Sequence, residues 1–360
     1  MEGNEILDLN AHPILDEASL RKIGRQRCGV ALVSTVNGTD GVQGGGIGHR
    51  KRTVKGESKV HTSGGTYLSV MTIHTVTHGL FKLDGGAMFG VVPKPLWTKY
   101  HPTDERNRCD WALRSLLIEE GNRLMLVDCG MGDKQGEKFF GHYAPRPEDL
   151  DAQLSTLGFN RDDITDVFLT HLHFDHCGGA IRRCKGKPDH LEPAFANATF
   201  WSTKRHWEWA NNPNPREKAS FLKDNIQPVE ASGQLKFIPR APDTTDTRHP
   251  IDGFPDLDVL FVDGHTESQM LPLLKRGSQK ALFTADLLPA TTHIPTAWVM
   301  GYDTRPLLTV AEKERILTCA ERESWTLLFE HDAQNEAATV HRTEKGIRLE
   351  RAGSRSEFNW

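Results

Sequence analysis

The sequence lacks the usual features of secreted and membrane proteins. Its six cysteines form no CxxC pair or zinc-knuckle spacing, and a chain of 360 residues does not need a disulfide framework. No run approaches the ~18–20 apolar residues of a membrane span, and no signal-peptide run follows the acidic start. A net charge of −4 disfavours nucleic acid as the main partner. These absences predict a cytoplasmic protein with free thiols and no membrane or nucleic-acid partner.

Aromatic residues are missing from the first part of the chain. No Phe, Trp or Tyr precedes Tyr67, whereas twelve of the 32 glycines lie within the first seventy residues. Such a segment buries too little apolar surface to offset the entropy lost on ordering. We therefore expect residues 1–70 to be a disordered or loosely packed N-terminal extension, and residues 71–360 to form one domain.

From residue 72 the pattern becomes globular. Short apolar runs bounded by turn residues predict strands. These runs cover 73–76, 113–118, 124–127, 167–169, 257–262, 281–284 and 326–329. Turn residues at 121–122 and 276–279 predict hairpins, and apolar spacing indicates helices at 150–157, 216–226 and 309–322. Hairpins combined with surface helices favour a layered α/β sandwich over a doubly wound sheet.

The densest group of chemically active side chains follows the apolar run 167–169. Three histidines and a carboxylate lie within six residues there, namely His171, His173, Asp175 and His176. Histidine is the commonest metal-binding side chain, and mixed His/Asp sets suit zinc, iron, manganese or cobalt. Three more candidates each follow an apolar run, namely His265, Asp286 and His331. Strands that end at one rim would bring the two sets together, so the pattern predicts a metal site.

The order of these motifs resembles that of the metallo-β-lactamase-fold hydrolases. The motifs are the HxHxDH run at 171–176, the GHT run at 264–266, the isolated Asp286 and the late His331. Leu126–Gly130 resembles an early aspartate motif of that family, and the resemblance covers roughly residues 72–345. It implies the α/β class, as a four-layer αββα sandwich with a two-metal site along one edge. Residues 71–360 would then be the catalytic domain.

The resemblance also assigns the ligands by position. The first metal would be held by His171, His173 and His265, the second by Asp175, His176 and His331, and Asp286 would bridge both. Asp128 would support the ligand loop without binding a metal. The cofactors would be two divalent metal ions, with Zn²⁺ favoured and Fe, Mn or Co as alternatives.

Within the family, residues 84–90 and 330–332 are most similar to the branch that contains N-acyl-homoserine lactonases and methyl parathion hydrolase. The chain lacks the cysteine ligand of true β-lactamases, the glutamate that flavo-diiron proteins carry in place of His173, and the long C-terminal tail of glyoxalase II. The branch implies a dinuclear hydrolase in which a metal-bridged hydroxide attacks a lactone or ester bond of a small-molecule substrate. Asp175 and Asp286 would be the catalytic residues.

Three alternatives stay open. The same site could hydrolyse phosphotriesters, since the metal chemistry is common to both reactions. A single iron could instead support an oxygenase similar to the persulfide dioxygenases, which use two histidines and one aspartate. The chain could also be a binding protein that kept the fold without the activity. The sequence leaves open whether the chain forms a homodimer.

Five residues are candidates for a substrate pocket. Phe89 and Trp97 belong to an apolar, proline-containing segment that could equally be core, and His293, Trp298 and Tyr302 lie in the stretch after Asp286. Lactonases of this branch carry a tyrosine shortly after the bridging aspartate, but here that place reads Leu-Leu-Pro. We therefore hypothesise that His293 or Tyr302 takes over its role at the carbonyl oxygen.

Overall fold

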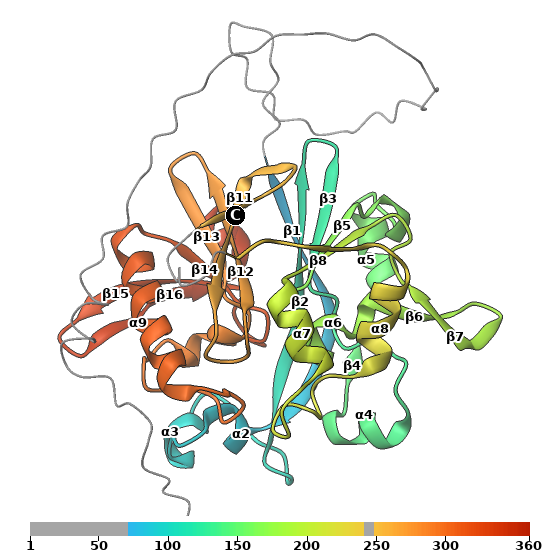
Figure 1. Ribbon diagram of the computed structural model, residues 1–360. Helices are drawn as coiled ribbons and strands as arrows, with labels where there is room; N and C mark the ends of the chain where they lie inside the picture. The colour runs from blue at the N-terminus through green and yellow to red at the C-terminus, as the bar shows by residue number, and fades with distance from the viewer. Residues whose placement is uncertain (1–70, 241–247) are drawn as a thin grey trace, which may run out of the picture. The chain divides into compact units, whose positions relative to one another are not determined.

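The computed structural model describes residues 71–240 and 248–360, so the predicted extension over residues 1–70 lies outside the described residues. Contacts along the chain group the described residues in a single unit. Two seven-stranded sheets and the helices that cover them make up this unit (Figure 1). Among the described residues, no helix combines the length and the apolar character that a membrane crossing requires.

The first sheet combines an antiparallel half with a parallel half. Its strands, in order across the sheet, are β4 (Arg146–Pro147), β1 (Thr72–Asp84), β2 (Arg108–Glu120), β3 (Arg123–Val127), β5 (Asp166–Phe168), β8 (Thr199–Ser202) and β9 (Leu235–Phe237). Neighbours from β4 to β3 pair antiparallel, and those from β3 to β9 pair parallel. The parallel strands therefore all end at the same edge.

The second sheet is antiparallel except where β13 and β14 pair parallel. Its strands, in order, are β10 (His249–Ile251), β11 (Phe254–Val262), β12 (Gln269–Arg276), β13 (Gln279–Phe283), β14 (Thr326–Leu328), β15 (Ala337–Thr343) and β16 (Gly346–Gly353). A separate hairpin joins β6 (Ile181–Cys184) to β7 (Lys187–Pro193).

Helices complete the outer layers (Figure 1). The longer ones are α4 (Glu137–Tyr143), α5 (Leu150–Thr156), α7 (Lys204–Asn211), α8 (Lys223–Ala231) and α9 (Pro306–Arg322). The shorter ones are α2 (Gly85–Phe89), α3 (Lys94–Trp97), α6 (Phe174–Cys177), η1 (Arg161–Asp163), η2 (Gly178–Ala180), η3 (Ala285–Leu287), η4 (Thr291–His293) and η5 (Arg355–Phe358). Apolar residues of α5, α7 and α8 pack on the first sheet, and those of α9 pack with the second. The layers are thus helix, sheet, sheet and helix, which confirms the predicted αββα sandwich.

The core lies between the two sheets. On β2, Leu116 and Ile118 join the cluster that contains residues of both sheets, whereas Leu117 joins the cluster under the first helical layer. This alternation follows from the two-residue period of a strand, which directs successive side chains to opposite faces. The first sheet is therefore buried on both faces, and its parallel strands read as continuous apolar runs.

A pair of matched substitutions tests where the stability of this sandwich comes from. Leu273 on β12 is fully buried in the core between the sheets, whereas Leu307 on α9 is 84% exposed. We expect Leu273→Ala to lower the free energy of unfolding by about 2–5 kcal/mol, and Leu307→Ala to change it by no more than about 0.5 kcal/mol. Urea denaturation of both variants measures the difference, and equal losses would contradict this assignment of the core.

The predicted strands and both hairpin turns are confirmed, as are the helices at α5 and α9. The helix predicted over 216–226 is wrong, because residues 216–220 form turns, residues 221–222 are irregular, and only residues 223–226 of that range belong to α8. The side chain of Asn214 accepts hydrogen bonds from the backbone nitrogens of Arg216 and Glu217. Such an Asx turn competes with helix formation and explains the difference.

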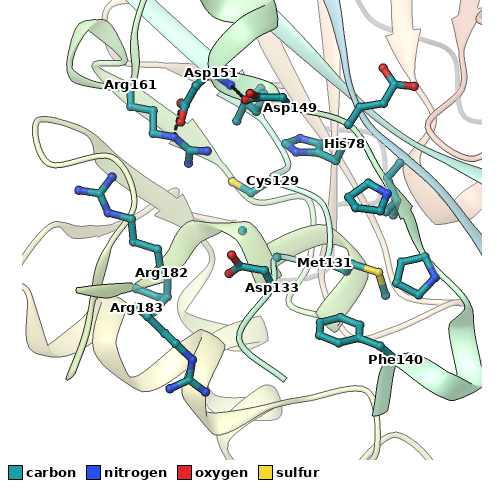
Figure 2. A pocket seen from close by; sticks show the side chains of 18 residues that line it. His78, Cys129, Met131, Asp133, Phe140, Asp149, Asp151, Arg161, Arg182 and Arg183 are labelled. Atoms are coloured by element: carbon teal, nitrogen blue, oxygen red, sulfur yellow. Dashed lines mark hydrogen bonds and ion pairs between the residues drawn. The ribbon is translucent and has the colours of Figure 1, made fainter. Parts of the chain in front are cut away.

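A cavity of about 570 Å³ is lined by segments that follow β3, surround β4 and follow α6 (Figure 2). Two of its cationic side chains are already paired, Arg161 with Asp151 and Arg182 with Glu192. None of the seven predicted metal ligands lines it. The cavity is therefore separate from the candidate metal site.

Candidate metal centre

All seven predicted metal ligands lie just past the ends of strands or on the short helix α6. The stretch after β5 carries His171 and His173, and α6 carries Asp175 and His176. The other three ligands follow strands of the second sheet, His265 after β11, Asp286 after β13 and His331 after β14. None of the seven is more than 7% exposed. The two sheets thus bring residues up to 160 positions apart to one edge, which matches the predicted arrangement.

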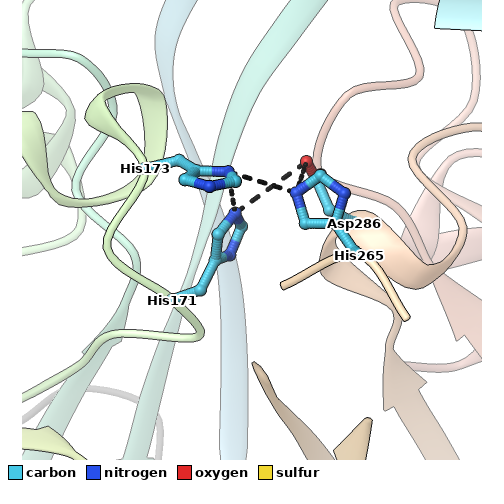
Figure 3. A group of neighbouring side chains, drawn as sticks. All are labelled: His171, His173, His265 and Asp286. Atoms are coloured by element: carbon cyan, nitrogen blue, oxygen red, sulfur yellow. Dashed lines mark hydrogen bonds and ion pairs between the residues drawn. The ribbon is translucent and has the colours of Figure 1, made fainter. Parts of the chain in front are cut away.

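The first group consists of His171, His173, His265 and Asp286 (Figure 3). The Nδ1 atom of His173 lies 3.1 Å from Nε2 of His171 and 3.1 Å from Nε2 of His265. Asp286 completes the group, because its Oδ2 atom lies 3.2 Å from Nε2 of His265. Three nitrogens and one carboxylate oxygen therefore converge on one point.

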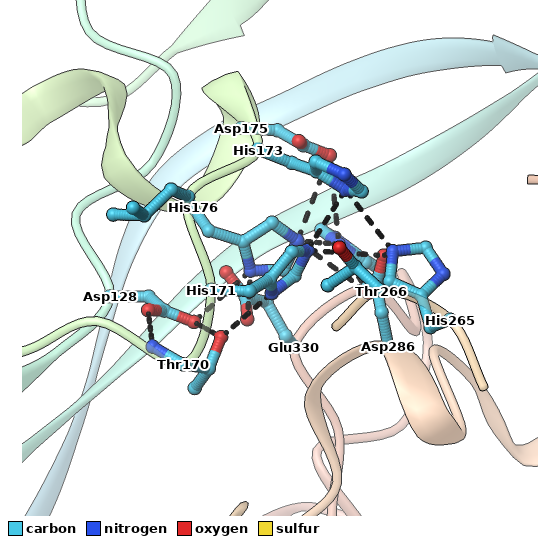
Figure 4. A network of polar contacts seen from close by, with 12 residues as sticks. Asp128, Thr170, His171, His173, Asp175, His176, His265, Thr266, Asp286 and Glu330 are labelled. Carbon is cyan, nitrogen blue, oxygen red and sulfur yellow. Dashed lines mark hydrogen bonds and ion pairs between the residues drawn. The ribbon is translucent and has the colours of Figure 1, made fainter. Parts of the chain in front are cut away.

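The second group consists of Asp175, His176 and His331. The Nε2 atoms of His176 and His331 are 3.1 Å apart, and Oδ2 of Asp175 lies 3.8 Å from Nε2 of His331. The Oδ1 atom of Asp286 faces this group at 3.2 Å from Nε2 of His331. It also lies 3.5 Å from Nε2 of His176, and Figure 4 labels both residues. The two oxygens of Asp286 thus address different groups, as a bridging ligand would.

The protonation of the rings tests whether this donor set fits a metal. Nδ1 of His331 is 2.7 Å from the carbonyl oxygen of Ala112, so Nδ1 carries the proton. Nδ1 of His176 faces carboxylate oxygens of Asp128 and Glu330 at 3.1 and 3.0 Å, which also require a proton on Nδ1. If both rings were neutral, the two Nε2 atoms would direct lone pairs at each other across 3.1 Å. A proton or a metal ion must therefore lie between them.

Two further observations agree with a metal. Nitrogens bound to one zinc ion at ~2.0–2.1 Å lie roughly 3.1–3.4 Å apart at near-tetrahedral angles, and the nitrogen separations here are 3.1 Å. The Oδ1 atom of Asp286 is buried and accepts no hydrogen bond among the described residues, which is costly for a polar atom unless a cation satisfies it. The residues present therefore fit two divalent cations.

Electrostatics in the centre favour cations. Burial by itself would raise the pKa of Asp286, but His176 and His265 reverse this effect and hold that pKa well below its usual value. Burial lowers the pKa of His331, but the charge of Asp286 outweighs it and the pKa rises to about 9. The ionised carboxylate thus attracts positive charge to the point where the two groups meet.

Asp128 supports the ligand loop, as the family resemblance implies. Its oxygens accept hydrogen bonds from the backbone nitrogen of Thr170 at 2.8 Å and from the Thr170 hydroxyl at 2.6 Å. Since that hydroxyl donates to Asp128, its oxygen accepts the proton on Nδ1 of His171, 3.0 Å away. Asp128 itself has a left-handed backbone, with φ of 59°. Such strain costs about 1–3 kcal/mol and commonly marks functional sites.

Several residues that contact the ligands were not predicted. Glu330 and Glu217 are buried carboxylates beside His176 and His173, and Asp303 is a buried carboxylate beside His265. The sequence alone led us to expect that His206 is a solvated surface histidine, but the residue is only 1% exposed, so this expectation is wrong. Its Nε2 atom accepts a hydrogen bond from the backbone nitrogen of Leu172 at 2.9 Å, so it holds the ligand loop. The sequence signal that could have found Glu330 is a charged residue directly after an apolar run, which indicates a buried carboxylate.

The five predicted pocket residues separate into two sets. Phe89, Trp97 and His293 are fully buried, and the Phe89 ring stacks on Trp97 at 5.1 Å and on His293 at 4.9 Å. Nε2 of His293 donates to the carbonyl oxygen of Met88 at 2.9 Å, so it carries the proton of the ring. Burial lowers the pKa of this ring to about 3 and keeps it neutral. This packing favours the core interpretation for these three residues. Trp298 is half-buried, and Tyr302 is 37% exposed.

Comparisons with known proteins agree with this geometry. The family model described as "Metallo-beta-lactamase superfamily" matches residues 114–331, which include Asp128 and all seven predicted ligands. The N-acyl homoserine lactonase AttM of Rhizobium radiobacter is 25% identical over 181 residues, and that of Azorhizobium caulinodans is 26% identical over 184. These matches cover 50% of this chain and 62% and 63% of the relatives. The chain thus spans less than two thirds of either relative.

Solved structures resemble a larger part of the chain. A probable metal-dependent hydrolase from Staphylococcus aureus is 27% identical, with a TM-score of 0.69 over 79% of this chain and 97% of its own. AidC, a dizinc quorum-quenching lactonase solved with a product, is 19% identical, with a TM-score of 0.62 over 79% of this chain and 95% of its own. The second likeness concerns the fold alone.

Proposed function

Because the chain belongs to the metallo-beta-lactamase superfamily, we propose that it is a dinuclear metal-dependent hydrolase that cleaves lactone or ester bonds. One observation carries the proposal, namely that seven buried ligand-type residues form two groups that share Asp286. The second group is the decisive part, since a mononuclear oxygenase would not need three further ligands. We propose Zn²⁺ as the ion in both groups.

The chemistry follows from the donor set. Bound divalent ions would lower the pKa of water from 15.7 to about 7 and polarise the oxygen of a carbonyl group. We assign Asp175 and Asp286 the task of orienting the attacking water and accepting its proton, since their carboxylates face the same edge of His331. The burial of these residues excludes bulk solvent and strengthens each interaction.

The substrate proposal rests on the wall beside Asp175. Phe174 packs against Tyr143 with ring centres 4.7 Å apart, and both contact Phe139 of α4. This aromatic surface suits an apolar acyl or aryl group next to the scissile bond. Together with the lactonase relatives, it favours a small lactone or ester with an apolar substituent.

Tyr302 is our candidate for the donor that supports the carbonyl or leaving oxygen. Burial raises the pKa of its hydroxyl, and the charges of Tyr143 and Asp175 act in the same direction. The hydroxyl therefore stays protonated at neutral pH and can donate a hydrogen bond.

We also propose, from the sequence, that the protein is cytoplasmic and that its partner is a small-molecule substrate.

The experiment combines metal analysis with a substrate panel. Protein reconstituted with Zn²⁺ is expected to bind about two ions per chain and to hydrolyse at least one of N-acyl homoserine lactones and aryl esters. Tyr302→Phe is expected to keep both ions and to lose about 10²-fold or more in kcat, as when one oxyanion donor is removed. One iron per chain with uptake of O₂, or no turnover of either substrate by fully loaded protein, would overturn the proposal.

A further inference from the structure

The two central histidines of the first group must carry their protons on opposite nitrogens. A neutral imidazole has one N–H and one lone pair, and only the lone pair can bind a metal. His173 presents Nδ1 to the group, whereas His265 presents Nε2. Metal binding therefore needs the proton of His173 on Nε2 and the proton of His265 on Nδ1.

Glu217 lies at the outer nitrogen of His173. Its Oε1 atom is 3.5 Å from Nε2 of His173, and its side chain is only 3% exposed. No hydrogen bond satisfies this buried nitrogen among the described residues, so Glu217 is the acceptor toward which its proton can point. The carboxylate is fixed from behind, because Oε2 accepts from Nε1 of Trp209 at 2.8 Å and from Nδ2 of Asn214 at 2.6 Å.

Asp303 has the same relation to His265. Its Oδ1 atom lies 3.0 Å from Nδ1 of His265, and the side chain is 1% exposed. Its Oδ2 atom accepts from the backbone nitrogen of Met300 at 3.2 Å. Each carboxylate therefore directs one oxygen at a ligand ring, and the other oxygen accepts hydrogen bonds from N–H groups. The Glu217 oxygen that faces His173 also accepts from the Thr266 hydroxyl at 2.6 Å.

We propose that Glu217 and Asp303 are positioning residues that impose opposite tautomers on His173 and His265, and so direct the lone pairs of these two rings into the first metal group. The inference rests on the proposed function, because it presumes that this group binds metal. Hydrogen-bonded partners of this kind orient ligand rings and raise their affinity for the metal. Here the partners also choose which nitrogen of each ring binds.

The fixed donors make the amide variants informative. In Glu217→Gln, the amide oxygen must face Trp209 and Asn214, so the amide nitrogen turns toward His173 and favours a proton on Nδ1. In Asp303→Asn, the amide oxygen must face the Met300 nitrogen, so the amide nitrogen favours a proton on Nε2 of His265. Each substitution keeps the shape of the side chain and moves a proton to the nitrogen that should bind metal.

The test measures zinc affinity by chelator competition and ring tautomers by ¹⁵N NMR, in the full-length protein. We expect either variant to bind one of its two zinc ions about 10–100-fold more weakly. In the metal-free state, the ring proton should move to Nδ1 of His173 in Glu217→Gln and to Nε2 of His265 in Asp303→Asn. Glu120→Gln is the matched control, because Glu120 is a buried carboxylate that accepts from the backbone nitrogen of Asp256 through Oε1 and belongs to neither metal group. It should bind zinc within about threefold of the wild type.

Wild-type affinity and unchanged tautomers in both variants would overturn the inference. The wild-type spectrum is an independent test that needs no variant to fold, since a proton on Nδ1 of His173 or on Nε2 of His265 in the zinc-loaded protein would also overturn it. A wild type that binds no zinc would instead refute the proposed function. The two failures are therefore distinguishable.

Discussion

Replacing Asp286 with asparagine is expected to abolish activity and to reduce the bound zinc from about two ions to one or fewer per chain. Asp286 is the only residue among those described whose two oxygens face both metal groups, at 3.2 Å from His265 and 3.2 Å from His331. The substitution keeps the size of the side chain but removes the negative charge that offsets the buried cations. The loss of kcat/KM should exceed the ~10²–10³-fold effect of removing one oxyanion donor, and metal analysis with steady-state kinetics measures both changes.

Asp258→Asn provides the matched control for this variant. Asp258 is also a buried aspartate of the second sheet, but it pairs with Lys275 at 3.0 Å and lies in neither metal group. It should retain about two ions and near wild-type kinetics. If Asp286→Asn kept both ions and its turnover, the bridging role would be refuted.

Removal of the metals by a chelator is expected to destabilise the fold as well as to stop turnover. The buried Nε2 atoms of His176 and His331, 3.1 Å apart, then lose the ion that would hold them together, and among the described residues Asp286 keeps a buried oxygen that accepts no hydrogen bond. A ligand present at about 1,000 times its Kd stabilises the native state by about 4 kcal/mol. At ~2 °C per kcal/mol for a domain of this size, the metal-free protein should melt roughly 8 °C lower.

Calorimetry with and without chelator measures this difference, and re-addition of Zn²⁺ should restore both Tm and turnover. The Asp286→Asn variant serves as the control, because its Tm should respond much less to the chelator. A wild-type Tm that did not change on chelation would contradict tight metal binding by the two groups.

The sequence predicted the fold, and it predicted the seven residues that the structure brings together in the two candidate metal groups. Ligand-type residues follow apolar strands at four places. They come together because strands that run in the same direction end at the same edge of a sheet. Local signals, namely apolar runs, two hairpin turns and amphipathic helices, predicted a layered α/β sandwich, and the family resemblance implied its four αββα layers. These signals lie within a few residues of one another, so they can be read from the chain alone.

The contacts around the ligands depended on the tertiary structure. Glu217 reaches His173 from a segment whose apolar spacing predicted a helix, and His206 holds the ligand loop although nothing near it in the sequence indicates burial. Asp303 and His265 are 38 positions apart and come together only through the packing of the loops. The same packing placed His293 in the core instead of the pocket.

The physical reason is the range of the interactions. The chain by itself determined which residues carry metal-binding chemistry and which strands deliver them, because side-chain type and periodicity are local properties. Only the tertiary structure decided which carboxylate faces which ring nitrogen, and hence which tautomer each histidine adopts. That choice depends on the relative positions of groups distant in sequence, which no local pattern encodes.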